Sequence, residues 1–159
     1  MQRKYEFTGE VNSKGLKRIY RLHDGCLGGW LASEANLSHD GGSWVSRNAQ
    51  VSENAQVFGD AQVFGNAQVS GNAQVSGNAR VSGDAQVFGG EWKTSPLFVQ
   101  GTRHGATNSS PGKLSIGCET RSFRGWRTSF QAIGKAAGYS EAEITEYHAI
   151  IKFFSAVGK

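Results

Sequence analysis

A run of six-residue repeats in the middle of the chain decides its fold. Residues 45–89 read VSRNAQ VSENAQ VFGDAQ VFGNAQ VSGNAQ VSGNAR VSGDAQ VFG. Valine opens all eight repeats, alanine holds the fifth place of the seven complete ones, and glycine holds the third place of six. Self-similarity at so short a period is typical of a β-solenoid, in which repeating units stack along one axis. Each hexapeptide is therefore expected to form one short strand and one corner.

The valine and the alanine of each repeat are expected to face the interior. Side chains alternate between the two faces of a strand, so an inward valine leaves the preceding glutamine and the following serine or phenylalanine outside. The alanine lies two residues before the next valine and points inward too, where its small side chain suits the narrow space near a corner. Gly-Asn and Gly-Asp pairs tolerate the left-handed backbone that a tight corner often needs.

The hexapeptide VSGNAQ at residues 69–74 resembles the repeat of the left-handed β-helix superfamily. This resemblance implies a triangular coil of three hexapeptides, and thus about two and a half coils between residues 45 and 89. It also favours a trimer as the form of assembly. It does not fix an activity, because the superfamily contains acyltransferases, carbonic-anhydrase-like enzymes and proteins without known activity.

Segments outside the regular repeats resemble a group of short hexapeptide-repeat proteins of bacteria and their phages. This resemblance covers most of the chain and implies a phage or prophage origin, but no assigned chemistry. The similar segments are GGW at residues 28–30, NLS at 36–38, IGC at 116–118, the tryptophan at 126, IG at 133–134 and GYSEAEITEY at 138–147.

The chain is expected to be mainly β and to have three regions. They are an N-terminal β-hairpin cap at 1–30, a short left-handed parallel β-helix at 31–92, and a C-terminal hairpin and two-helix region at 93–159 that caps the coil or serves in oligomerisation. A solenoid this short has two open ends with unpaired strand edges. We therefore expect both flanks to cap it and the chain to oligomerise.

Local patterns place the elements within these regions. Residues 4–11 and 16–23 flank Asn-Ser-Lys-Gly, which is a hairpin signal. Leu31, Ala35 and Leu37 already keep the spacing of the repeat and predict an imperfect first coil. In the C-terminal region the patterns predict a hairpin of residues 97–100 with 113–116. A helix is expected at 122–135, because Phe123, Trp126 and Phe130 share one helical face. A second helix is expected after the capping box Ser140–Glu143.

Composition and charge narrow the class of protein. The 159 residues carry a net charge of +4, with nine Lys and Arg against four Asp and Glu after residue 92, so an anionic partner is expected to meet that part. No apolar run approaches the ~20 residues of a membrane helix. The first ten residues lack the apolar segment of a signal peptide. We expect a cytoplasmic protein, located in the host cytoplasm if a phage encodes it. Cys26 and Cys118 lack metal-ligand spacing and are expected to be free thiols, with no metal bound.

His39 is a weak candidate for a catalytic base. Acyl transfer, the best-known activity of the superfamily, needs a general base, usually a histidine, to deprotonate the acceptor. The regular repeats contain no histidine and no cysteine, whereas His39 lies in the loop just before them and within reach of a coil face. An ordinary loop residue is the favoured interpretation. A zinc enzyme is not expected, because the four histidines are scattered.

Outward phenylalanines are the candidate oligomer interface. Phe58, Phe64 and Phe88 replace serine in a row that otherwise faces solvent. Apolar side chains from adjacent coils would form a patch on a flat wall, and such a patch usually marks a contact. A subunit interface is the favoured interpretation, and cover by this chain's own termini or by a foreign partner are the alternatives.

Basic residues of the C-terminal region form the candidate ligand site. Guanidinium groups hold phosphates through charge-assisted hydrogen bonds, although a solvated helix face is the plain alternative. The candidate residues are Arg121, Arg124 and Arg127, with Arg103, His104 and Lys113 nearby in the sequence.

These features predict a non-catalytic, phage-type β-helix protein that forms a homo-oligomer, most simply a trimer. We expect it to bind or sequester an anionic host component, such as a nucleotide signal or an acidic surface of a defence protein, and so to counteract host defence. No cofactor is expected. Two alternatives stay open: an acyltransferase that uses acetyl-coenzyme A and His39, and a purely structural oligomerisation module.

Overall fold

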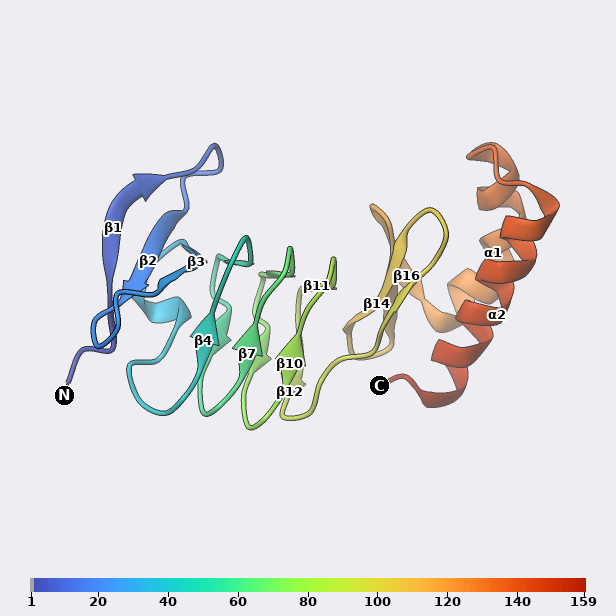
Figure 1. The fold of residues 1–159 in the computed structure, drawn as a ribbon. Coiled ribbons are helices and arrows are strands. Elements are labelled where there is room, and N and C mark those ends of the chain that lie inside the picture. Colours follow the sequence, from blue (N-terminus) through green and yellow to red (C-terminus); the bar gives the residue numbers. More distant parts are fainter. Residues whose placement is uncertain (1) are drawn as a thin grey trace. The chain divides into compact units, whose positions relative to one another are not determined.

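The computed structural model describes residues 2–159, which divide into two compact units. The first unit ends at Pro96 and the second begins at Leu97. In Figure 1 the first unit contains stacked turns of short strands, and the second contains a small antiparallel sheet and two helices.

The first unit is a parallel β-solenoid of about four turns with three walls, here named A, B and C (Figure 1). Each strand of the repeats pairs with the strand three places further along the chain. Wall A comprises β3 (Leu27–Leu31), β5 (Gln50–Val51), β8 (Gln68–Val69) and β11 (Gln86–Val87); wall B comprises β6 (Gln56–Val57), β9 (Gln74–Val75) and β12 (Glu91–Trp92); wall C comprises β4 (Trp44–Val45), β7 (Gln62–Val63) and β10 (Arg80–Val81).

The register of the walls defines the length of a turn. Val51 pairs with Val69, and Val69 pairs with Val87, so one turn spans three six-residue repeats. The expected fold class, mainly β with a parallel solenoid, a hairpin sheet and two helices, is confirmed. The left hand of the coil stays a prediction.

The interior of the solenoid contains the valines and alanines of the repeats, as the alternation predicts. Every one of these side chains is at most 1% exposed. Full burial of a valine stabilises a fold by roughly 1.5–3 kcal/mol. Backbone N–H groups of one turn donate to carbonyl oxygens of the next, for example from Gln50 to Ala67 at 2.9 Å. The same core and the same ladder therefore recur from turn to turn.

Left-handed backbone marks the corners, as the Gly-Asn and Gly-Asp pairs predict. Gly71 has a φ of +62°, and a Cβ placed there would lie 2.1 Å from the carbonyl oxygen of Phe88 in the next turn. Arg47 and Glu53 adopt the same conformation without being glycine. The Oε2 atom of Glu53 accepts a hydrogen bond from the Gly71 N–H at 2.6 Å, so at this corner the carboxylate links two turns.

The N-terminal hairpin, β1 (Tyr5–Val11) and β2 (Lys17–Arg21), extends wall A beyond its first strand. Because β2 pairs antiparallel with β3, the outer edge of the wall is a hairpin strand. Tyr5 and Ile19 are 1% and 0% exposed. The Tyr5 hydroxyl donates to the carbonyl oxygen of Leu37 at 2.9 Å, and its ring meets that of Trp44 edge-on. The hairpin thus closes the start of the solenoid core.

The first turn contains two more residues than the regular 18-residue turns, and the last pairing, of Val75 with Trp92, spans one residue fewer. Leu31 pairs with Val51 and Leu37 bridges to Val57, so each leucine stands twenty residues before its partner. Both leucines are buried. The predicted imperfect first coil is confirmed in this respect.

Ala35 does not take the inward place that its spacing predicts, and that prediction is wrong. Ala35 is exposed, whereas Asn36 is 1% exposed. The chain forms a short 3-10 helix, η1 (Glu34–Asn36), which shifts the inward position by one residue. The Asn36 side chain then donates to the carbonyl oxygens of Ala55 and Glu53 at 2.8 and 3.1 Å. A polar side chain that satisfies two carbonyl groups replaces the small apolar one.

The second unit begins with a four-stranded antiparallel sheet. The prediction that residues 97–100 pair with 113–116 is wrong, because another strand lies between them. That strand is rich in small polar residues, and its Ser109 is buried and accepts a hydrogen bond from Ser115 at 2.7 Å. In sheet order the strands are β13 (Phe98–Gln100), β14 (Gly105–Ser110), β15 (Lys113–Ile116) and β16 (Glu119–Ser122).

The two predicted helices follow this sheet and pack against it. They are α1 (Phe123–Ala136) and α2 (Glu141–Val157). Ser122 caps α1 by accepting from the Gly125 N–H, and Ser140 and Glu143 form the predicted capping box of α2. The core of the unit contains Leu114 of the sheet, Trp126 of α1 and Ile151 of α2.

Candidate functional site

His39 packs against the N-terminal hairpin. Its Nδ1 accepts the backbone N–H of Lys4 at 3.2 Å, and its Nε2 lies 2.9 Å from Oε1 of Glu34. Because Nδ1 accepts a hydrogen bond, the ring proton lies on Nε2. The hydrogen bond from Nε2 to Glu34 is the main cause that lowers the pKa of the Glu34 carboxyl group. The ring also stacks on Tyr5 at 4.3 Å. A general base needs a free nitrogen. Both nitrogens of His39 are engaged, Nδ1 with the backbone of Lys4 and Nε2 with Glu34 of η1, which argues against a catalytic role.

Arg103 lies at the far end of α1 from the other arginines. Its Nε pairs with Glu143 at 2.9 Å, and its terminal nitrogens donate to the carbonyl oxygens of Ala137 and Gly138. Its guanidinium group lies 4.6 Å from the centre of the Tyr139 ring. The structure therefore does not bring Arg103 into one cluster with the arginines at the start of α1, and its donors already hold the α1–α2 connection.

Three cationic side chains surround the start of α1 and are called the basic group: Lys113, Arg124 and Arg127. Lys113 lies opposite Ser122, the N-cap of α1, in the β15–β16 pair. Arg124 and Arg127 lie in the first two turns of α1, and all three side chains are exposed. The first turn holds no acidic residue. Within residues 2–159 no ion pair neutralises any of the three.

Arg121 belongs to β16 and not to the helix. It pairs with Leu114 in the sheet, and one of its terminal nitrogens lies 3.3 Å from Oε2 of Glu119. Its Nε is buried, without a partner in the described part of the chain. Part of its charge is thus balanced by Glu119, so Arg121 lies beside the basic group but contributes less free charge.

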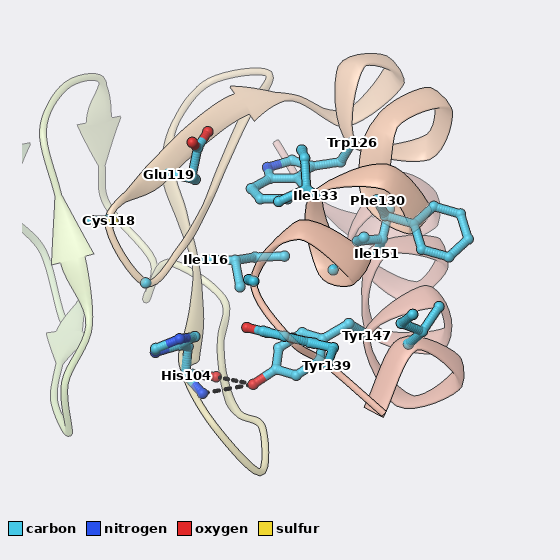
Figure 2. A pocket seen from close by; sticks show the side chains of 14 residues that line it. His104, Ile116, Cys118, Glu119, Trp126, Phe130, Ile133, Tyr139, Tyr147 and Ile151 are labelled. Atoms are coloured by element: carbon cyan, nitrogen blue, oxygen red, sulfur yellow. Dashed lines mark hydrogen bonds between the residues drawn. The ribbon is translucent and has the colours of Figure 1, made fainter. Parts of the chain in front are cut away.

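The second unit also holds an apolar pocket that the sequence did not indicate. Its volume is about 130 Å³, and Figure 2 shows it between the β15–β16 turn and the two helices. The apolar wall includes Ile116, Trp126, Ile133, Ile144 and Ile151. Concave apolar sites with a few polar groups are where proteins bind small molecules.

Four side chains supply the polar atoms around this pocket: His104, Cys118, Glu119 and Tyr139 (Figure 2). Partial burial, with a smaller effect of Tyr147, raises the pKa of Tyr139, so its hydroxyl is a protonated donor at neutral pH. Cys118 is free and exposed. His104, a predicted ligand residue, therefore lies at this pocket and not with the basic group.

Two sequence segments that line the pocket stand out, but neither contains a motif that predicts its chemistry. The segments IGC at 116–118 and GYSEAEITEY at 138–147 resemble phage-type proteins, and that resemblance implies no chemistry. Both segments line the pocket. Periodicity places Trp126 in the core, but it does not reveal that the core leaves an opening beside that side chain.

The three outward phenylalanines lie on three different walls. Phe58 follows β6 of wall B, Phe64 follows β7 of wall C, and Phe88 follows β11 of wall A. The expected single patch is therefore wrong, because residues share a wall only when a whole turn separates them. Phe58 and Phe64 lie on neighbouring walls of the same turn, with the corner at residues 59–60 and all of β7 between them, and Phe58 and Phe88 are each 37% exposed. Their role as an interface stays a prediction.

Residues 2–159 contain neither a metal-ligand cluster nor a membrane-spanning helix. No group of three His, Cys, Asp or Glu side chains is arranged to hold a metal ion. None of the helices in that range has the length and apolar character needed to cross a membrane. Cys26 and Cys118 are both free, as predicted.

Comparison with known proteins supports the solenoid. A family described as the YdcK beta solenoid repeat matches residues 73–89. These residues contain β9, β10 and β11, one strand from each wall. No curated protein matches the chain. The repeat match and the stacked turns agree that this chain is a β-solenoid repeat protein.

Proposed function

We propose that this protein is a non-catalytic binding protein that forms a homo-oligomer and captures a phosphate-bearing anion, with a nucleotide as the favoured ligand. The distribution of charge carries the proposal. Residues 1–96 hold nine Lys and Arg and nine Asp and Glu, whereas residues 97–159 hold eight against four. The entire net charge of +4 therefore belongs to the second unit.

The basic group gives this charge a location. Arg124 and Arg127 project from the first two turns of α1, where the helix dipole already favours negative charge. Guanidinium groups match the geometry of phosphate oxygens and form strong charge-assisted hydrogen bonds. An unpaired Lys113 adds a third donor beside the same helix start. A phosphate at this place would meet three cations and no carboxylate of the first turn.

The solenoid supplies a scaffold in this proposal. Its core is aliphatic and its corners are glycine-rich, and short solenoids gain stability when their open ends and walls are covered. We infer assembly into a homo-oligomer, with a trimer as the form that the superfamily resemblance favours. The resemblance to phage-type hexapeptide proteins supports a phage or prophage origin and a role in removing a host signal.

Calorimetric titration with nucleoside mono-, di- and triphosphates and cyclic nucleotides tests the proposal. The triple variant Lys113→Ala, Arg124→Ala, Arg127→Ala should bind at least about tenfold more weakly, because charge-assisted hydrogen bonds are lost. The control Lys14→Ala, Arg80→Ala, Lys93→Ala removes the same charge from the first unit and should bind like the unchanged protein. Equal affinity of both triple variants would overturn the proposal. Arginine-dependent capture of an acidic host protein, without nucleotide binding, would show that the ligand class is wrong.

A further inference from the structure

We propose that the apolar pocket of the second unit is a binding site for a ligand with a single, neutral aromatic ring that carries a hydrogen-bonding substituent. This site does not depend on the proposed capture of anions. It lies among other residues, and the basic group contributes no side chain to its lining.

The size of the pocket selects a single ring. Its volume is about 130 Å³, and apolar cavities of roughly 150 Å³ take up benzene. Isoleucine side chains from the sheet and both helices supply the apolar wall, for example Ile116, Ile133 and Ile151. A single ring fills such a volume, and the apolar wall removes it from water.

The walls of the pocket are fixed before any ligand arrives. Trp126 is held because its Nε1 donates to the carbonyl oxygen of Leu114 at 2.6 Å. Tyr147 is held by its hydroxyl, which donates to the carbonyl oxygen of His104 at 2.9 Å (Figure 2). Gly134 is also buried, and a Cβ there would come within 3.1 Å of Ile144. A preformed cavity binds without the cost of ordering its side chains.

The polar atoms at the pocket favour a neutral ligand. Tyr139 offers a hydroxyl donor, Glu119 offers carboxylate acceptors, and His104 offers a ring nitrogen. No lysine or arginine lines the pocket, so its lining supplies no cation for an anionic ligand. A phenol-like or benzyl-alcohol-like ring, with its polar group toward these side chains, satisfies both parts of the site. The ligand class therefore differs from the phosphate proposed for the basic group.

The two free cysteines provide a direct test with an internal control. Cys118 lies at the pocket, whereas Cys26 lies in the first unit, and both thiols are exposed. The thiolate attacks a cysteamine-capped fragment disulfide, forms a mixed disulfide with the fragment and releases cysteamine. Benzyl fragments should accumulate on Cys118 roughly tenfold above hydroxyalkyl fragments of equal length, because the ring is buried. Cys26 should show no such preference. Equal labelling of Cys118 by both fragment types would overturn the proposal.

A second experiment removes the thiol chemistry and blocks the site. Benzyl alcohol should shift the NMR signals of Ile116 and Ile133 in Cys118→Ser, which keeps the pocket. Ala137 lines the pocket and its exposed neighbour Ala136 does not. Ala137→Trp should abolish the shifts and Ala136→Trp should keep them. Shifts that persist in Ala137→Trp, or that are absent from Cys118→Ser, would contradict the assignment. Nucleotide binding is expected to be unaffected in all three variants, which separates this site from the proposed function.

Discussion

The hydroxyl of Tyr147 donates to the carbonyl oxygen of His104 at 2.9 Å and accepts the N–H of the same residue at 2.6 Å. It also accepts the N–H of Arg103 at 3.1 Å. One side chain of α2 thus satisfies three backbone groups of the β13–β14 loop. This contact ties the loop to the helix beside the apolar pocket.

Removal of this hydroxyl is expected to loosen the loop. Tyr147→Phe removes the acceptor of the Arg103 and His104 N–H groups, whereas the His104 carbonyl oxygen keeps the Gly101 N–H as a donor at 3.1 Å. The amides of Arg103 and His104 should therefore exchange with solvent faster by one or more orders of magnitude, as measured by hydrogen exchange with NMR detection. Tyr139→Phe is the matched control, because within residues 2–159 no hydrogen bond ties the Tyr139 hydroxyl to this loop. Equal protection of the two amides in both variants would contradict the role given to the Tyr147 hydroxyl.

The glycine at a solenoid corner is expected to be irreplaceable for two reasons. Gly71→Ala places a Cβ 2.1 Å from the Phe88 carbonyl oxygen in a left-handed conformation, whereas Gly15→Ala has a φ of +79° but meets no atom within 4 Å. Backbone strain alone costs about 1–2 kcal/mol. Chemical denaturation should show that loss for Gly15→Ala and a distinctly larger loss for Gly71→Ala. Similar losses would mean that the turns are not packed this closely.

Glu143 is expected to make the second unit sensitive to acid. The backbone N–H of Ser140, and then Arg103, hold the pKa of Glu143 below its ordinary value of 4.5. Because the folded state has the lower pKa, the stabilisation is complete above the unfolded value and is lost as the pH falls through the folded value. The unfolding free energy followed by NMR signals of the second unit should therefore fall below about pH 4.5.

Glu143→Gln should remove this part of the pH dependence and lower stability at neutral pH. Glu141→Gln, in the same first turn of α2, is the control and should keep the pH dependence of the unchanged protein. If both variants keep the same acid sensitivity, Glu143 is not the source of the pH dependence.

Phe58 and Phe64 are expected to act together in the proposed oligomer, since they take equivalent places in consecutive repeats of the same turn. Serine occupies the equivalent place in neighbouring turns, so Phe58→Ser with Phe64→Ser should fold normally. Loss of two partly buried aromatic side chains should raise the dissociation constant at least about tenfold. Phe88→Ser, on wall A, is the control. Sedimentation analysis would contradict this view if only Phe88→Ser dissociated the protein.

The solenoid was predictable because its sequence is periodic. Each repeat valine and alanine lies in the core as alternation requires, and the turn of three repeats is the one that the resemblance to the left-handed β-helix superfamily implies. Strict periodicity also shows why the phenylalanine patch was wrong: residues 58, 64 and 88 are not separated by whole turns. The pattern fails where the period breaks, as at Asn36, because a 3-10 turn and its hydrogen bonds override residue spacing.

The second unit was predictable only in part. The spacing of Trp126 and the capping box at Ser140 fixed both helices, since these signals are local. The strand β14 escaped detection because small polar residues form it, and their burial depends on hydrogen bonds to other segments, for example from the Lys159 N–H to Oδ1 of Asn108 at 2.7 Å. The pocket and the separation of Arg103 from Arg124 are products of tertiary packing. No local pattern contains that information.

Native mass spectrometry of the protein isolated from cells tests the central claim most directly, because it reports subunit number and retained small molecules together. The account predicts a homo-oligomer, with three copies as the expected form, that retains a phosphate-bearing molecule. The same oligomer without that molecule is expected for the variant lacking Lys113, Arg124 and Arg127. A monomer at micromolar concentration with no bound anion would contradict the account.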